Sequence, residues 1–140
     1  MLSEEEKQAL QVKLSQESRS IPVSVFRCGL SGLEAVTVFL KDTRQWNIRR
    51  ISSELNRKPS TLYATYTNAK KKLSQEMDVT DFSFAIPVDV FADRRFSVLE
   101  LIVSHMRDKQ DLALPRIATL LGKNYSTVKT AYRRYRKKCL

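Results

Sequence analysis

An internal repeat is the feature of this sequence that most restricts its fold. The segment Ile21-Pro22-Val23-Ser24-Val25-Phe26 recurs as Ile86-Pro87-Val88-Asp89-Val90-Phe91, and after one inserted residue the correspondence continues to the end of the chain. A repeat of this length predicts two copies of one small structural unit. Matching positions are Asp42 and Asp108, Arg50 and Arg116, Leu55 and Leu121, Ser60 and Ser126, Tyr66 and Tyr132, and Lys71 and Lys137.

Each copy contains three segments with helical spacing of apolar residues. In the first copy the helices are expected at about residues 31–42, 48–55 and from Pro59 onward, and in the second at about 97–108, 115–121 and after Asn124. Asn56 and Gly122 tolerate the left-handed conformation that ends a helix in a tight turn. With three glycines and four prolines in 140 residues, the chain is expected to be all-α, as two tandem trihelical units.

A further helix is expected at the N-terminus. Ser3 and Glu6 have the spacing of a capping box, and Leu10 and Leu14 share one face. Residues 13–17 also echo residues 72–76, so that a remnant of a third unit is an alternative origin for this helix. The predicted organisation is an N-terminal helix at 1–20, a first unit at 21–75, a linker at 76–85 and a second unit at 86–140.

Positive charge is concentrated toward the C-terminus. The net charge is +10, and residues 1–20, 21–81 and 82–140 carry −1, +4 and +7. No acidic residue follows Asp111, and none lies between Leu55 and Gln75. Such an excess on a small protein favours a polyanionic partner.

The second and third helices of each copy resemble a helix-turn-helix. The stretch from Ile117 to Lys129, with the small residue Ala118 and the turn residue Gly122, is similar to the motif in the fourth region of bacterial sigma factors and in response-regulator DNA-binding domains. The first copy has Ser52 and Asn56 at these two positions. The paired arrangement also resembles small tandem helix-turn-helix proteins of archaeal type. The resemblance covers residues 30–73 and 96–139 and implies that the third helix of each unit enters the DNA major groove.

The outward side chains of the two third helices, and of the turns before them, are the candidate DNA-binding residues. Asn68 is suited to adenine, whereas Arg133 and Arg134 suit guanine or phosphate, so the first unit is expected to be more selective and the second to supply more affinity. The candidates in the first unit are Arg57, Lys58, Ser60, Thr61, Tyr63, Ala64, Thr67, Asn68 and Lys71. In the second they are Lys123, Asn124, Ser126, Thr127, Lys129, Thr130, Arg133, Arg134 and Lys137.

Other residues have structural interpretations. The basic clusters 70–72 and 136–138 suit the last turn of a helix, where cations meet the helix dipole. Glu34 is expected to pair with Arg50, and Glu100 with Arg116, as framework ion pairs. Trp46 is expected to close the core.

Three tyrosines and both cysteines are also assigned to packing. Tyr66, Tyr132 and Tyr135 are expected in the core, each with a hydroxyl that reaches water. Cys28 and Cys139 are expected as reduced thiols in or near apolar cores.

Several function classes find no support in the sequence. There is one histidine, His105, with no Cys-x-x-Cys pair, Gly-rich phosphate loop or cluster of carboxylates, so neither an enzyme nor a metal or other cofactor is expected. No apolar run is long enough for a membrane span, and the acidic N-terminal segment does not resemble a signal peptide, so a cytoplasmic protein is expected.

The sequence therefore favours a sequence-specific double-stranded DNA-binding protein, a transcriptional regulator that acts as a monomeric pseudo-dimer or as a homodimer. Since the units are joined in tandem, two unlike half-sites in direct order are expected. One alternative is sequence-tolerant binding of chromosomal DNA or of RNA. Another is an adaptor that docks to RNA polymerase or to another transcription protein through the acidic N-terminal helix.

Overall fold

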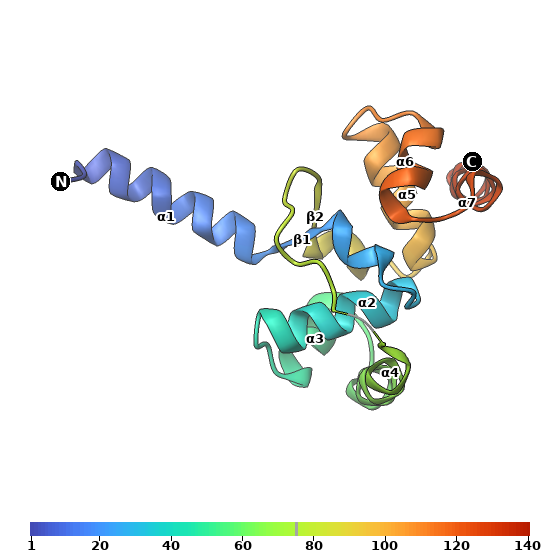
Figure 1. The fold of residues 1–140 in the computed structure, drawn as a ribbon, viewed down its shortest axis with the longest axis horizontal. Coiled ribbons are helices and arrows are strands. Elements are labelled where there is room, and N and C mark those ends of the chain that lie inside the picture. The colour runs from blue at the N-terminus through green and yellow to red at the C-terminus, as the bar shows by residue number, and fades with distance from the viewer. Residues whose placement is uncertain (75) are drawn as a thin grey trace.

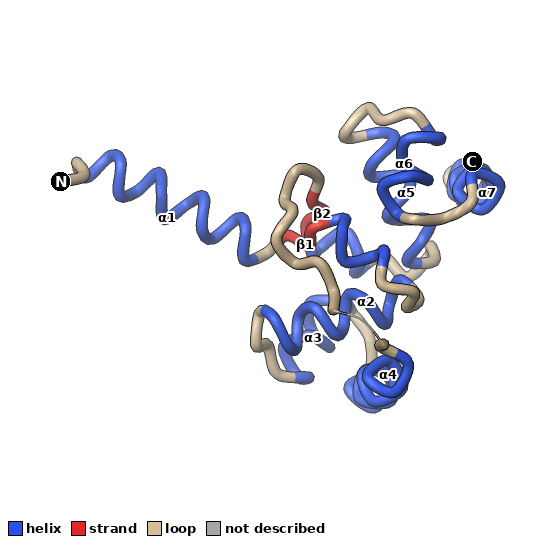
Figure 2. The backbone as a smooth tube through the Cα atoms, in the orientation of Figure 1, coloured by secondary structure: helices blue, strands red, loops and turns tan. Residues whose placement is uncertain are grey.

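Helices dominate the chain and are connected by short loops (Figures 1 and 2). The structure is a computed structural model that describes residues 1–74 and 76–140, with side chains for all of these except residues 12–18. The first half comprises α1 (Glu4–Ser18), β1 (Ser20–Pro22), the 3-10 helix η1 (Val23–Arg27), α2 (Gly32–Val38), the π-helical turn η2 (Phe39–Thr43), α3 (Ile48–Leu55) and α4 (Pro59–Lys72).

The second half repeats this order from its strand onward. It comprises β2 (Ala85–Pro87), the 3-10 helix η3 (Val88–Ala92), α5 (Val98–Asp108), α6 (Leu114–Leu121) and α7 (Tyr125–Lys138). The helices expected in each copy are thus confirmed. The first helix differs between the copies, because α2 passes into a π-helical turn at Phe39 whereas α5 continues as one α-helix.

Local sequence determines where these helices begin and end. Ser31 and Ser97 each accept a hydrogen bond from the backbone N–H three residues on, and Glu34 and Glu100 complete the two capping boxes. α3 ends at Asn56 and α6 at Gly122, with φ of 55° and 64° in the left-handed region. These two residues turn the chain sharply into α4 and α7.

The helices of both halves enclose one hydrophobic core. Ile51 and Leu55 in α3, and Ile117 and Leu121 in α6, are buried as the helical spacing predicts. Trp46 is also buried, so the packing role expected of it is confirmed. Burial of these side chains holds the second helix of each half against the third.

The N-terminal segment of each half packs against the other half. β1 and β2 form an antiparallel pair in which Ile21 lies opposite Ile86. Beyond this pair, η1 of the first half packs against α6 of the second, and η3 of the second half packs against α3 of the first. The 3-10 helix of each half therefore covers α3 or α6 of the other half.

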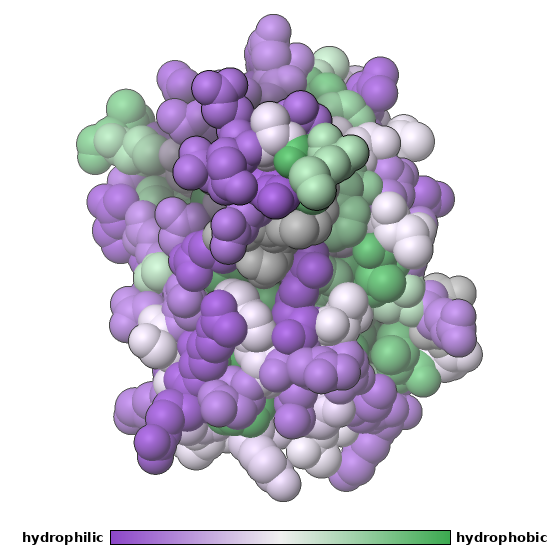
Figure 3. Space-filling model, turned by 90° about the vertical axis from the view of Figure 1, so that its left-hand side faces the viewer, coloured by the Kyte–Doolittle hydropathy of each residue, from purple (hydrophilic) through white to green (hydrophobic). Residues whose placement is uncertain are grey.

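The N-terminal helix α1 projects away from the rest of the chain (Figure 1). The predicted contact between Ser3 and Glu6 is present, with the Glu6 N–H donating to Ser3 Oγ at 3.1 Å. Leu10 is exposed, while Leu14 and the echo at residues 13–17 fall on side chains outside those described. On this side the surface is mostly hydrophilic, with apolar groups scattered over it (Figure 3).

The segment between the two halves packs on the body at its two phenylalanines. The Arg44 guanidinium lies 5.5 Å from the ring centre of Phe82, and the Arg116 guanidinium lies 5.5 Å from that of Phe84. Phe84 is half-buried by this contact, whereas Phe82 remains 36% exposed. Every helix in the described part of the chain is too short or too polar to cross a bilayer.

Candidate nucleic-acid interface

α4 and α7 bury one narrow face and expose the other. Leu62 and Ala69 of α4, and Val128 and Ala131 of α7, point into the core. None of the eighteen candidate residues is buried; Arg57, Lys123 and Thr130 are half-buried, and the other candidates are exposed. The structure therefore brings each candidate set together on one accessible helix face and the turn before it.

The two helices occupy comparable positions in the fold. Both lie on the side of the molecule away from the projecting end of α1, and both are seen nearly along their axes in Figure 1. Their axes therefore run in nearly parallel lines. Neither α4 nor α7 contains an acidic residue.

The cations on the candidate faces have no carboxylate partners. No ion pair within the described side chains involves any of the eight cationic candidates, which are Arg57, Lys58, Lys71, Lys123, Lys129, Arg133, Arg134 and Lys137. Their neighbours differ, because Lys70, Lys72 and Lys138 do hold acidic partners. Ion pairs therefore involve three exposed lysines in the last turns of these helices and none of the eight candidates, although the charge of Arg134 helps to lower the pKa of Glu100.

The framework ion pairs expected for Glu34 and Glu100 involve other partners. Glu34 binds Lys72 at 2.9 Å and Glu100 binds Lys138 at 2.6 Å, so the prediction of arginine partners was wrong. Lys72 and Lys138 lie in the last turns of α4 and α7. These pairs tie the C-terminal end of each third helix to the N-terminal end of the first helix in the same half.

The two arginines from that prediction stack on aromatic rings instead. The Arg50 guanidinium lies 3.8 Å from the ring centre of Trp46, and Arg116 covers Phe84. The helical spacing of the sequence predicts which face of the helix these arginines occupy. It does not predict whether an aromatic ring or a carboxylate from another element lies beside them.

Both glutamates keep a low pKa. Burial on its own raises the pKa of Glu100, but the hydrogen bond from Lys138 and that from the Ser97 backbone outweigh this effect, and the pKa is lowered overall. Glu34 is lowered in the same way, with burial opposed by the Ser31 backbone and Lys72. Ionised carboxylates therefore hold these helix ends at neutral pH.

Tyrosines brace the third helices from inside. The Tyr66 hydroxyl donates to Asp42 Oδ1 at 2.7 Å, and the Tyr132 hydroxyl donates to Asp108 Oδ1 at 2.7 Å. These hydrogen bonds raise the pKa of both phenols. Tyr66, Tyr132 and Tyr135 are half-buried, so they pack as expected, but the first two hydroxyls bind carboxylates rather than reaching only water. Tyr63, on the outward face of α4, is 65% exposed.

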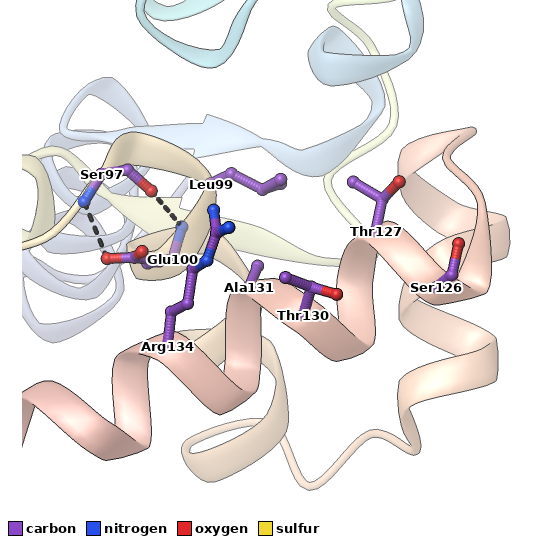
Figure 4. A pocket seen from close by; sticks show the side chains of 8 residues that line it. All are labelled: Ser97, Leu99, Glu100, Ser126, Thr127, Thr130, Ala131 and Arg134. Atoms are coloured by element: carbon purple, nitrogen blue, oxygen red, sulfur yellow. Dashed lines mark hydrogen bonds between the residues drawn. The ribbon is translucent and has the colours of Figure 1, made fainter.

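A recess of about 300 Å³ lies between the start of α5 and α7. Four candidate residues line it: Ser126, Thr127, Thr130 and Arg134. Figure 4 shows Arg134 extending from α7 toward the capping box of Ser97 and Glu100. Hydroxyl and guanidinium donors of this kind suit the sugar-phosphate backbone of DNA.

A second cleft, of about 440 Å³, is lined by residues from both halves. It is lined by Ser52, Ser53, Asn56, Arg57, Lys58 and Arg94, without an acidic residue. Arg57 Nε is buried with no hydrogen-bond partner among the described residues, and burial followed by the charge of Arg94 lowers the pKa of Arg57. Sequence reasoning missed Arg94, because only the crossed packing of η3 on α3 brings this residue to the first half.

The two thiols have different environments. Cys28 is buried, as expected, but Cys139 is exposed. Cys139 follows the last turn of α7 and lines a recess together with Phe96, Leu101 and Tyr135, so it lies near the apolar core but not in it. In the described part of the chain, no three His, Cys, Asp or Glu side chains are grouped closely enough to bind a metal ion.

Comparison with known proteins adds no relative to this picture. The chain matches no protein-family model, no curated protein and no solved structure.

Proposed function

We propose that this chain is a sequence-specific double-stranded DNA-binding protein, a transcriptional regulator built from two tandem helix-turn-helix units. In this proposal α3 with α4 forms one motif and α6 with α7 the other. The third helix of each motif, α4 or α7, enters the major groove, whose width admits an α-helix.

The observation that carries the proposal is the unpaired positive charge on two equivalent helices and on the turns before them. All eight cationic candidates lack an ion-pair partner among the described side chains, whereas neighbouring lysines of the same helices are paired internally. Unpaired like charges gathered on one accessible surface create a local positive potential that attracts polyanions. A phosphate backbone supplies such anions, and counterion release then contributes to binding affinity.

Sequence reading is assigned to polar side chains at the exposed centres of the two faces. Asn68 and Thr67 on α4, with Arg133 and Arg134 on α7, carry donors and acceptors suited to base edges. Arg57 and Lys58 before α4, and Lys123 before α7, are assigned to phosphate contacts in this proposal. Because one chain supplies both helices, a monomer acts as a built-in pair, although homodimers remain compatible with the proposal.

A sequence-tolerant nucleic-acid binder and a protein-binding adaptor are the competing functions. The first shares the basic faces but reads no bases. The second would use α1 as the docking element and would leave the charged faces unused.

Selection from a randomised duplex library at near-physiological salt tests the proposal. Sequencing of the bound fraction is expected to show an enriched motif with two spaced parts. Binding without enrichment would favour packaging of DNA or binding of RNA. Absence of binding would favour the adaptor.

A further inference from the structure

The two halves of the chain are related by a local two-fold axis. In the β1–β2 pair, Ser20 lies opposite Pro87 and Pro22 lies opposite Ala85, with Ile21 and Ile86 at the centre. The hydrogen bonds that flank the pair are reciprocal. The Val23 N–H donates to the Phe84 carbonyl at 2.9 Å, and the equivalent Val88 N–H donates to the Arg19 carbonyl at 2.8 Å.

Equivalent residues also meet each other near this axis. The ring centres of Phe26 and Phe91, which match in the repeat, are 6.4 Å apart. A methyl group added at Gly32 would lie 2.6 Å from Cγ1 of its counterpart Val98. Self-contacts between equivalent positions occur at a two-fold axis, and a direct tandem translation of one unit onto the next does not produce them.

Contacts farther from the axis come in reciprocal pairs. Asn56, at the end of α3, donates its side-chain N–H to the carbonyl of Ala92 at 3.2 Å. The matching residue Gly122, at the end of α6, lies against Arg27, with 3.6 Å from an added Cβ to Arg27 Cγ. Each motif turn thus contacts the end of the other half's 3-10 helix.

We infer that the DNA target consists of two inverted half-sites of unlike sequence, bound by one chain in one orientation. The inference rests on the proposed function. Duplex DNA has local two-fold axes perpendicular to its length, and a protein with a two-fold axis aligned on one of them presents its recognition helices to inverted half-sites. This replaces the direct order that the tandem arrangement of the sequence predicts.

The two half-sites are expected to differ in base sequence. The two-fold axis relates the backbones of the two halves, but the side chains at equivalent positions are not the same. Equivalent outward positions on α4 and α7 carry different chemistry: Tyr63 matches Lys129, Ala64 matches Thr130, Thr67 matches Arg133 and Asn68 matches Arg134. An amide suits adenine and a guanidinium suits guanine, so the two helices prefer different base pairs. The target then has a polarity that a palindrome lacks.

Reversing one half-site tests this inference separately from the proposed function. The starting duplex is the one enriched by selection, and a second duplex carries one half turned into direct order at the same spacing. The full chain is expected to bind the direct duplex about 100-fold more weakly, since several base contacts are lost together. Equal or tighter binding of the direct duplex would overturn the inference while leaving the proposed function intact. If no duplex is enriched in the first place, both proposals fail.

Tethered cleavage tests the orientation. An iron chelate is attached to Lys58→Cys or to Asn124→Cys, which occupy equivalent positions before α4 and α7, each in a Cys139→Ser background with the buried Cys28 retained. Each conjugate is expected to cut one half-site, and the two conjugates are expected to cut different halves. Equal cutting of both halves by either conjugate would overturn binding in one orientation.

A variant in which α4 carries outward side chains of α7 tests whether these positions determine the half-site sequence. Thr67→Arg with Asn68→Arg gives α4 the pair found at the equivalent positions of α7. A repeated selection is expected to yield two halves that are more alike and still inverted. Unchanged halves would contradict the assignment of half-site identity to these positions.

Discussion

Ile21 and Ile86 are equivalent residues of the repeat, and they face each other across the antiparallel pair of β1 and β2. Both side chains are fully buried. The point where the copies are most alike in sequence is therefore also the point where they join. The 3-10 helix of each half covers a helix of the other half, η1 on α6 and η3 on α3. Neither half therefore has a complete core without its counterpart.

Substitution at this junction is expected to destabilise the whole chain. Ile86→Ala should lower the free energy of unfolding by about 2–5 kcal/mol, because it leaves a cavity between the halves. Calorimetry should show one transition that moves as a unit to lower temperature. Two separated transitions, with only one of them shifted, would contradict the shared core.

Gly32 and Val98 are expected to be energetically coupled. Gly32→Ala inserts a methyl group against Val98 Cγ1 and should lower the free energy of unfolding by about 1–3 kcal/mol. Val98→Ala in the same chain removes that γ-carbon and should recover part of the loss. Denaturant unfolding of the two single variants and the double variant measures the coupling, and strictly additive effects would show that the halves do not touch here.

Besides the base contacts proposed for them in the selected site, Arg133 and Arg134 are expected to supply affinity for any duplex, because the same guanidinium groups bind phosphate where no matching base is present. Arg133→Ala with Arg134→Ala should weaken binding to all sequences and reduce the slope of log affinity against log salt by up to about 2, because each lost phosphate contact removes about 0.9. Fluorescence anisotropy at several salt concentrations measures the slope. Lys7→Ala, on α1, is the control and should leave the slope unchanged.

Asn68 is expected to affect base preference more than affinity. Asn68→Ala removes the amide suited to adenine and should reduce discrimination at one base pair by about 1–3 kcal/mol. Competition between the selected duplex and single-base variants gives this difference. A uniform loss across all duplexes would place Asn68 on the phosphate backbone instead.

Glu100 makes stability depend on pH. Its pKa is lowered in the folded protein, so its contribution is present above the unfolded value of about 4.3 and is lost as the pH falls through the folded value. Glu100→Gln should therefore cost about 1–3 kcal/mol at pH 7 and less at pH 3. Unfolding at both pH values measures the change, and Glu5→Gln, at an exposed position on α1, serves as the control. A cost for Glu100→Gln that is equal at both pH values would show that its charge does not hold the helix.

Much of the architecture follows from sequence alone, because it depends on short-range chemistry. Capping by Ser31 and Ser97, the left-handed turns at Asn56 and Gly122, and the helical spacing of Ile51 and Leu55 all act within a few residues. The same holds for the outward faces of α4 and α7, since helical periodicity places buried and exposed positions on opposite sides. The candidate residues could therefore be named, although their function stays a proposal.

Only the tertiary structure decided which distant groups meet. The choice of Lys72 and Lys138 as partners of the two glutamates depends on how the third helix lies across the first. The two-fold relation depends on β1 pairing with β2 in antiparallel order, and this crossing also brings Arg94 beside Arg57. A repeat in sequence determines that two similar units form, but the direction in which their edges pair is set by long-range packing, which no local pattern records.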